Sequence, residues 1–236
     1  MSLIEQSLEK LDFDIDDRKS EYFNEFGQCV PRVTSILSRM IHNDALMSWA
    51  NYIGMKGIKY RDFMNQASTI GTNAHNAIEK YLQEKIKTEN NIPFLGFLEW
   101  YNLLTIDNGF PIEVVYIEHH IACRWFGGTL DCLARIAGKL YLIDFKTSNH
   151  VTFSYFLQLA AYRYMLREVE GIEVDGVIVL QLGKEDVGFN EYLLDLSIPD
   201  HLFFINHFEE TFMSLVYGYY NIYYAEKMFN KLFRKV

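Results

Sequence analysis

Two short runs of residues carry acidic and basic side chains at spacings that favour a shared site. Residues 127–131 read GGTLD and residues 142–146 read LIDFK, so each run contains an aspartate and the second adds a lysine two residues later. Ala137 and Gly138, between the runs, are typical of a tight β-turn. The two runs are therefore predicted to be neighbouring strands of an antiparallel hairpin.

The register of this hairpin decides whether the acids meet. If Ile136 faces Lys139, then Asp131 lies opposite Asp144 with Cβ atoms about 5 Å apart, and Lys146 leaves the same face as Asp144. Two carboxylates at that distance repel each other, and burying them is costly unless a cation lies between them. Carboxylate oxygens are the ligands that Mg²⁺ and Mn²⁺ prefer, so the pattern favours a divalent-cation site. A slip of one residue would separate the acids.

These residues also resemble a known family. Gly128-x-x-Asp131 followed by Asp144-x-Lys146 is similar to the PD-(D/E)XK nuclease superfamily, and specifically to its RecB-type exonuclease branch. Residues 71–79 (GTNAHNAIE) resemble the helical histidine motif of that branch, and Gln158-x-x-x-Tyr162 resembles its Q-x-x-x-Y helix. The opening run at residues 31–37 (PRVTSIL), with Trp49, is similar to phage and mitochondrial single-domain genome maintenance exonucleases. The resemblance covers roughly residues 31–182.

The resemblance implies roles for individual residues. The implied metal ligands are His75, Asp131, Asp144 and the main-chain carbonyl of Phe145. The implied catalytic residues are Asp131, Asp144, Lys146, Gln158 and Tyr162. Within this set, Lys146 would position the attacking water, and Gln158 and Tyr162 would contact DNA and orient the lysine. Taken alone, a histidine in this position is more often a hydrogen-bonded core residue than a metal ligand.

Further candidates stand near these motifs. Glu79, one helical turn after His75, is either a supporting acceptor for the imidazole or an ordinary helix glutamate. Glu118 is a candidate for supporting or joining the metal site. Arg163 and Arg167 are candidates for DNA phosphate contacts, the alternative being a solvated helix face.

The surrounding pattern predicts a mixed α/β fold. Thr72 is the expected N-cap of a helix that starts at Gly71. Other helices are expected over residues 34–52, 94–108, 153–169 and from 199 onward, with strands over 113–123, 127–136, 140–146 and 174–182. A mixed central sheet flanked by helices follows, and the resemblance implies a restriction-endonuclease-like core. Residues 1–30 are expected to be a loosely attached acidic arm, and residues 31–236 a single nuclease domain with C-terminal helices.

The composition limits which cofactors and which cellular location are expected for the protein. The 236 residues are 50% hydrophobic and 22% charged, which excludes a disordered chain. Three cysteines fit no metal spacing and are fewer than the four of the iron–sulfur members of the branch, so no iron–sulfur cluster is expected. The chain has no Walker A sequence, and we expect no nucleotide cofactor. With no long apolar run and no signal-like start, a cytoplasmic protein of bacterial or phage origin without membrane contact is expected.

The predicted function is a Mg²⁺- or Mn²⁺-dependent deoxyribonuclease, an exonuclease acting on single-stranded or free DNA ends in repair, recombination or replication. The net charge of −9 does not exclude DNA, because steering depends on the local field around a cleft. One alternative is a non-catalytic nucleic-acid or protein-binding module that keeps the nuclease fold. Another is an RNA-directed nuclease of the same chemistry. An oligomer is compatible with the sequence but not indicated by it. Alanine at Asp144 or Lys146 is expected to abolish cleavage and to leave the fold nearly intact.

Overall fold

The computed structural model describes residues 3–8, 21–41, 44–87 and 91–233. Its centre is a five-stranded sheet whose strands lie side by side in chain order. The strands are β1 (Ile112–Ala122), β2 (Gly127–Ile136), β3 (Lys139–Lys146), β4 (Gly176–Leu182) and β5 (Phe189–Asp195). Only β3 and β4 run parallel, and the other neighbours are antiparallel.

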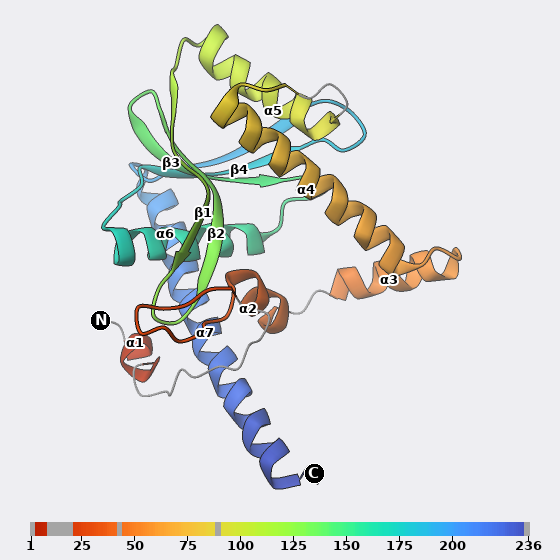
Figure 1. Ribbon diagram of the computed structural model, residues 1–236, viewed down its shortest axis with the longest axis vertical. Helices are drawn as coiled ribbons and strands as arrows, with labels where there is room; N and C mark the ends of the chain where they lie inside the picture. The colour runs from red at the N-terminus through yellow and green to blue at the C-terminus, as the bar shows by residue number, and fades with distance from the viewer. Residues whose placement is uncertain (1–2, 9–20, 42–43, 88–90, 234–236) are drawn as a thin grey trace.

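Helices cover both faces of this sheet (Figure 1). On one face α6 crosses behind the strands and packs against α7 and α2, whereas α4 and α5 pack on the strands from the other side. The helices are α1 (Leu3–Leu8), α2 (Val33–Met40), α3 (Asp44–Met55), α4 (Tyr60–Glu84), α5 (Ile92–Asn102), the π-helical turn η1 (Leu103–Asp107), α6 (Phe153–Glu170) and α7 (Pro199–Phe233). The predicted mixed α/β fold, a central sheet flanked by helices, is confirmed. No helix in the described residues is both long and apolar enough to cross a membrane.

The hairpin that positions the acids has the predicted turn. Ala137 and Gly138 both have positive φ angles, 51° and 84°, the combination that a two-residue turn between twisted strands requires. Ile136 pairs with Lys139, and the same register continues to the pair Cys132 and Ile143. The predicted strand register is therefore confirmed.

Two apolar layers hold the sheet between the helices. Strand β4 is buried along its whole length, as expected for a central strand with a parallel neighbour and helices on both faces. Leu142 and Val179 face the layer beneath α6 and α7, while Ile143 and Leu180 belong to the layer beneath α4 and α5. The acids of the candidate site lie where the pairing of β3 with β2 ends, while β3 continues to pair with β4.

Several predicted boundaries were wrong. The helix expected over residues 34–52 is two helices, α2 and α3. Helix α4 begins at Tyr60, so Thr72 lies inside it and is not an N-cap. The helix expected over residues 94–108 ends as α5 at Asn102 and continues as a π-helical turn. Strand β5 was not predicted at all.

The first 30 residues are not a loosely attached arm where the structure describes them. Helix α1 packs against α7, and Leu8 and Val30 are fully buried. The Tyr22 hydroxyl lies 2.7 Å from Thr129 Oγ1 on β2, which joins this segment to the sheet. Most of the acids that suggested an arm fall in residues 9–20, outside the described residues. The described part of the segment is thus integral to the domain.

Candidate active site

Three neighbouring strands each bring one acid to the same level of the sheet. Ile117 pairs with Cys132 and His119 pairs with Leu130, which places Glu118 of β1 level with Asp131 of β2. The β2–β3 pairs end at Cys132 and Ile143, and the next position on each strand is Asp131 and Asp144. The cluster of acids predicted from the hairpin is therefore extended by Glu118.

Where the backbone pairing of β2 and β3 stops, the carboxylate of Asp131 provides the next hydrogen bond between the two strands. Its Oδ2 accepts a hydrogen bond of 2.8 Å from the main-chain N–H of Phe145, in place of a strand carbonyl. Asp131 is buried, with 7% of its surface exposed, so this hydrogen bond fixes the carboxylate between the two strands. Oδ1 is left to face His75, 3.7 Å from its Nδ1.

Asp144 and Lys146 form a buried ion pair. The ammonium lies 2.7 Å from both carboxylate oxygens, donates a hydrogen bond to Oδ1, and sits over the ring of Tyr155 at 5.1 Å from its centroid. Asp144 is 1% exposed, and its Oδ2 accepts no hydrogen bond from the described residues. Burial raises the pKa of the Asp144 carboxyl above its ordinary value, although the Lys146 charge opposes that rise. Burial lowers the pKa of Lys146, but Asp144 and Asp131 outweigh this effect and raise it.

His75, on α4, faces the middle of β1 and β2 and the end of β3. Its Nδ1 is 3.2 Å from Glu118 Oε1, and its Nε2 is 3.1 Å from the main-chain oxygen of Phe145. Burial acts to lower the pKa of His75, but the hydrogen bond with Glu118 and the charge of Asp131 raise it to about 9. The surrounding acids thus favour the protonated imidazole, which must release a proton before one of its nitrogens can bind a metal ion.

The donor set fits a divalent cation. Ligand atoms of His75, Glu118 and Asp131 all lie within 4.8 Å of one another, and the Phe145 carbonyl is adjacent to the imidazole. One nitrogen with carboxylate and carbonyl oxygens is a set that Mn²⁺ or Mg²⁺ can accept. Asp144, predicted as a metal ligand, is not part of this group, and its carboxylate pairs with Lys146. Glu118, predicted as a candidate for supporting or joining the site, thus stands among the possible ligands.

Helix α4 and strand β1 also form an open hollow of about 420 Å³ beside His75. Glu79 lines this hollow, as do Gly71 and Thr72. Its carboxylate accepts a 3.3 Å hydrogen bond from Gln83 and makes none with His75. Glu118, and not Glu79, is therefore the acceptor that orients the imidazole.

The backbone of Glu118 is strained. Its φ angle is 46°, which places it in the left-handed region that side-chain-bearing residues avoid. A register shift between Val114 and Tyr116 lies just upstream in the same strand. Strain of this kind costs about 1–3 kcal/mol, and it persists only where the surrounding structure holds it. In β1, the residue with the strained backbone is also the one whose carboxylate points toward His75.

Gln158 and Tyr162 lie beneath the acids. Gln158 Nε2 donates to the Tyr162 hydroxyl at 3.2 Å, and the two side chains are 8% and 3% exposed. A Cβ on Gly128 would come within 2.6 Å of the Tyr162 ring, so the glycine of this motif makes room for the tyrosine. Nearby Asp131 and Asp144 contribute to a raised pKa of Tyr162, after burial as the main cause. The placement fits a supporting role and leaves little surface for direct contact with DNA.

Arg163 and Arg167 do not face the acidic site. Arg163 is 7% exposed, and its Nη1 donates to Glu209 and Asn206 of α7 at 2.9 and 3.0 Å. Arg167 forms a two-pronged pair with Glu209 as well. These arginines join α6 to α7, so the structure does not support their predicted contact with DNA phosphates. The alternative of a solvated helix face is also wrong for Arg163.

Comparisons with known proteins add little to this description. No family model matches the chain, and no curated protein matches it. A solved structure titled "Crystal structure of SSO0001" aligns over 90% of this chain and 82% of its own length, at 13% identity and a TM-score of 0.35. A similarity this low says nothing about fold or function. The acidic cluster and its surroundings therefore have to be interpreted from their own chemistry.

Proposed function

We propose that the chain is a metal-dependent nuclease that hydrolyses phosphodiester bonds in DNA, a member of the RecB-type PD-(D/E)XK branch that its motifs resemble. In this proposal it is a cytoplasmic enzyme that uses Mg²⁺ or Mn²⁺ and acts on single-stranded or free ends. The observation that carries the proposal is the convergence of three acids from adjacent strands with Lys146 and His75. Such a group is costly to bury unless it serves a cation and a charged substrate.

The chain's own residues divide the work. His75, Glu118, Asp131 and the Phe145 carbonyl would hold the ion, which when bound polarises a phosphate and lowers the pKa of water. Lys146, held by Asp144 and the Tyr155 ring, presents an ammonium that offsets the charge of the reacting phosphate.

The charge distribution supports a nucleic-acid substrate on the side of α4. Residues 56–87 contain six basic side chains against three acids, in a chain of net charge −9. The excess lies in lysines just before and after α4, because the helix itself holds two basic side chains and three acids. These flanking lysines offer a polyanionic strand a favourable local approach. This feature does not separate DNA from RNA.

The test is cleavage of short DNA and RNA strands labelled at the 5′ or the 3′ end, in Mg²⁺, in Mn²⁺ and in EDTA. We expect DNA cleavage that needs the metal and that is lost in Asp131→Asn and Lys146→Met. The matched control is Lys139→Met, which removes a lysine from the opposite end of β3. Asparagine replaces Asp131 here because it keeps the shape of the side chain.

Each outcome separates the proposal from its rivals. Cleavage in EDTA, or equal cleavage by the Asp131→Asn variant, contradicts the proposed chemistry. Metal-dependent cleavage restricted to RNA points to the RNA-directed nuclease. Strand binding without turnover points to the non-catalytic module.

A further inference from the structure

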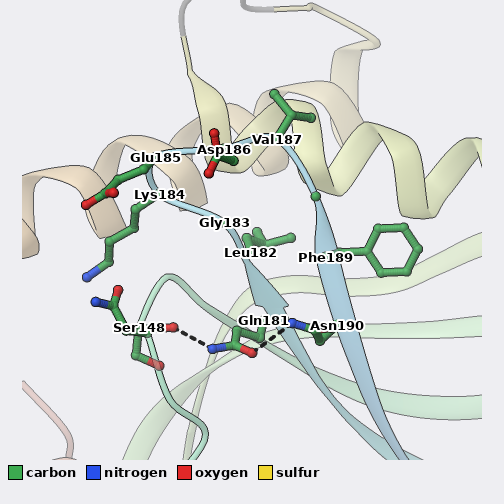
Figure 2. Close-up of a pocket in the computed structure, with 12 residues that line it drawn as sticks. Ser148, Gln181, Leu182, Gly183, Lys184, Glu185, Asp186, Val187, Phe189 and Asn190 are labelled. Carbon is green, nitrogen blue, oxygen red and sulfur yellow. Dashed lines mark hydrogen bonds between the residues drawn. The ribbon is translucent and has the colours of Figure 1, made fainter.

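A second hollow, of about 480 Å³, lies between the connection after β3 and the loop that joins β4 to β5 (Figure 2). Its lining is largely polar and includes Ser148, Asn149, Gln181, Lys184 and Asn190. A volume of this size is within the usual range for small-molecule sites. None of the motifs in the sequence accounts for it.

The hollow continues the row of side chains that starts at the candidate site. Lys146 of β3 pairs with Gln181 of β4, and Gln181 pairs with Asn190 of β5. Paired residues project from the same face, and neighbouring strands are about 4.8 Å apart. Gln181 is thus one strand away from the proposed catalytic lysine, a distance that a single nucleotide spans.

The amide of Gln181 is held in one orientation. Gln181 is 9% exposed, its Nε2 donates to the main-chain oxygen of Ser148 at 2.7 Å, and its Oε1 accepts from Asn190 Nδ2 at 3.2 Å (Figure 2). An amide nitrogen carries two hydrogens, and within the described residues one of them has no acceptor. The side chain is therefore an oriented donor at the floor of the hollow.

The far wall of the hollow is the loop between β4 and β5, which is held by a backbone hydrogen bond and by packing against α5. The N–H of Gly183 donates to the oxygen of Gly188 at 3.0 Å, which closes the β4–β5 loop on itself. A Cβ on Gly96 would collide with that same Gly188 oxygen, so α5 and the loop meet backbone to backbone. The loop is packed against α5 across the top of the hollow, as Figure 2 shows.

The charges of the lining select the chemistry of the ligand. Lys184 is opposed by Glu185 and Asp186 on the same loop, so the wall has no excess of positive charge for a phosphate. The remaining polar side chains are Ser148, whose hydroxyl donates to the main-chain oxygen of His150, and the amides of Asn149, Gln181 and Asn190, which both donate and accept. Amides of this kind recognise the edges of nucleobases.

We propose that this hollow receives the base of a nucleotide next to the bond that is cleaved, with Gln181 and Asn149 as its base-binding residues. The inference rests on the proposed nuclease function and adds a subsite to it. The phosphate lies at the acids and Lys146, while the neighbouring base turns out of its stack into the hollow. Asn149 is exposed and lines the hollow, so its amide is accessible to the base.

The test combines altered protein with altered substrate. A set of short single strands, each lacking one base at a successive position, is cleaved by the wild type, by Gln181→Leu and by Asn149→Ala. At one position relative to the cleaved bond, loss of the base should lower kcat/KM of the wild type about fivefold. On the intact strand, kcat/KM of the two variants should be lower than that of the wild type by a similar factor. For these variants, removing the base at that position should cause no further decrease in kcat/KM.

Asn221→Ala, an exposed amide on α7, should behave as the wild type does. Because Asn149 is exposed, its variant keeps the inference testable even if Gln181→Leu does not fold. If the missing base lowers kcat/KM by the same factor in the wild type and in both variants, the base pocket is contradicted. Metal-dependent cleavage in the same experiment would still support the nuclease function. If the protein binds the strands without cleaving them, dissociation constants from fluorescence anisotropy replace the rates and the same pattern is expected. An absence of both binding and cleavage overturns both proposals.

Discussion

A lysine at each end of β3 forms an ion pair with an aspartate: Lys139 with Asp195 of β5, and Lys146 with Asp144 of β3 itself. At one end Lys139 Nζ donates to Asp195 Oδ2 at 2.8 Å, and at the other Lys146 Nζ donates to Asp144 at 2.7 Å. The Lys139 side chain is 46% exposed, whereas Lys146 is 18% and Asp144 is 1% exposed. The comparison shows that ion-pair geometry by itself does not mark a site.

Surroundings set the two pairs apart. Hydrogen bonds from Lys139 and Ser197 hold the pKa of Asp195 well below its usual range, which is the behaviour of an ordinary surface pair. Burial raises the pKa of Asp144 instead, so its charge is held against a solvation cost. The fold does not require a desolvated carboxylate at the end of a strand. The buried pair of Asp144 and Lys146 is therefore the functional candidate.

The largest expected difference between the two pairs is in catalysis. Asp144→Asn and Lys146→Met should each lower metal-dependent cleavage by on the order of 10²–10³-fold, because the charge aimed at the phosphate is lost or misplaced. Asp195→Asn and Lys139→Met should stay within about twofold of the wild type, since an exposed pair far from the reacting phosphate supplies no such charge. Initial rates on one labelled strand provide the measurement. Equal losses at both ends of β3 would remove the distinction.

The next difference is in stability. Asp144→Ala leaves a buried ammonium without its partner and should lower the free energy of unfolding by about 3 kcal/mol. The double variant Asp144→Ala/Lys146→Met removes both charges and should recover most of that loss. Urea unfolding in EDTA measures both effects, with Asp195→Ala as the control that changes little. The structure therefore replaces the expectation that alanine at Asp144 or Lys146 leaves the fold nearly intact.

We expect the pH dependence of stability to reflect the protonation of the His75 imidazole. Its pKa is about 9 in the fold against an ordinary value of 6.5, so the folded state holds a proton that the unfolded chain releases. The resulting stability is fully present below pH 6.5 and is lost as the pH rises toward 9. In EDTA the melting temperature of the wild type should fall over this window, and His75→Gln should remove that fall. His207→Gln, on the exposed surface of α7, is the control, and a flat wild-type profile would contradict the assignment.

The smallest expected effect concerns the strained backbone of Glu118. Glycine adopts a φ of 46° without strain, so Glu118→Gly should be more stable than Glu118→Ala by about 1 kcal/mol, although both lose the carboxylate. At Glu113, in the same strand but with no positive φ, alanine should be the more stable of the two. Thermal unfolding of the four variants decides this. Alanine more stable at both positions would mean that Glu118 is not strained.

The hairpin was predictable because its signals are local. Ala137-Gly138 fixes the turn, the turn fixes the register, and the register places Asp131 beside Asp144. Contact between Glu118 and His75 was not predictable, because it depends on the one-residue shift in β1 that brings position 118 level with Asp131. Without that shift, position 118 would lie opposite Leu130.

Other elements were missed for physical reasons of the same kind. Strand β5 is an edge strand whose middle residues are exposed, so it lacks the alternation that predicts a strand. The first turns of α4, from Tyr60 onward, are also mostly exposed and present no apolar stripe. Arg163 and Arg167 find Glu209 more than 40 positions along the chain, a pairing that only the packing of α6 on α7 creates.

We propose that the buried end of β3 is built around a divalent cation. Crystals soaked in Mn²⁺ and measured at the manganese edge test this directly, because the anomalous signal locates the ion without assumptions about activity. We expect a strong peak about 2.0–2.3 Å from the ligand atoms of His75, Glu118 or Asp131 and none at Asp195. A peak only at exposed acids, or no peak in soaked crystals, would contradict it.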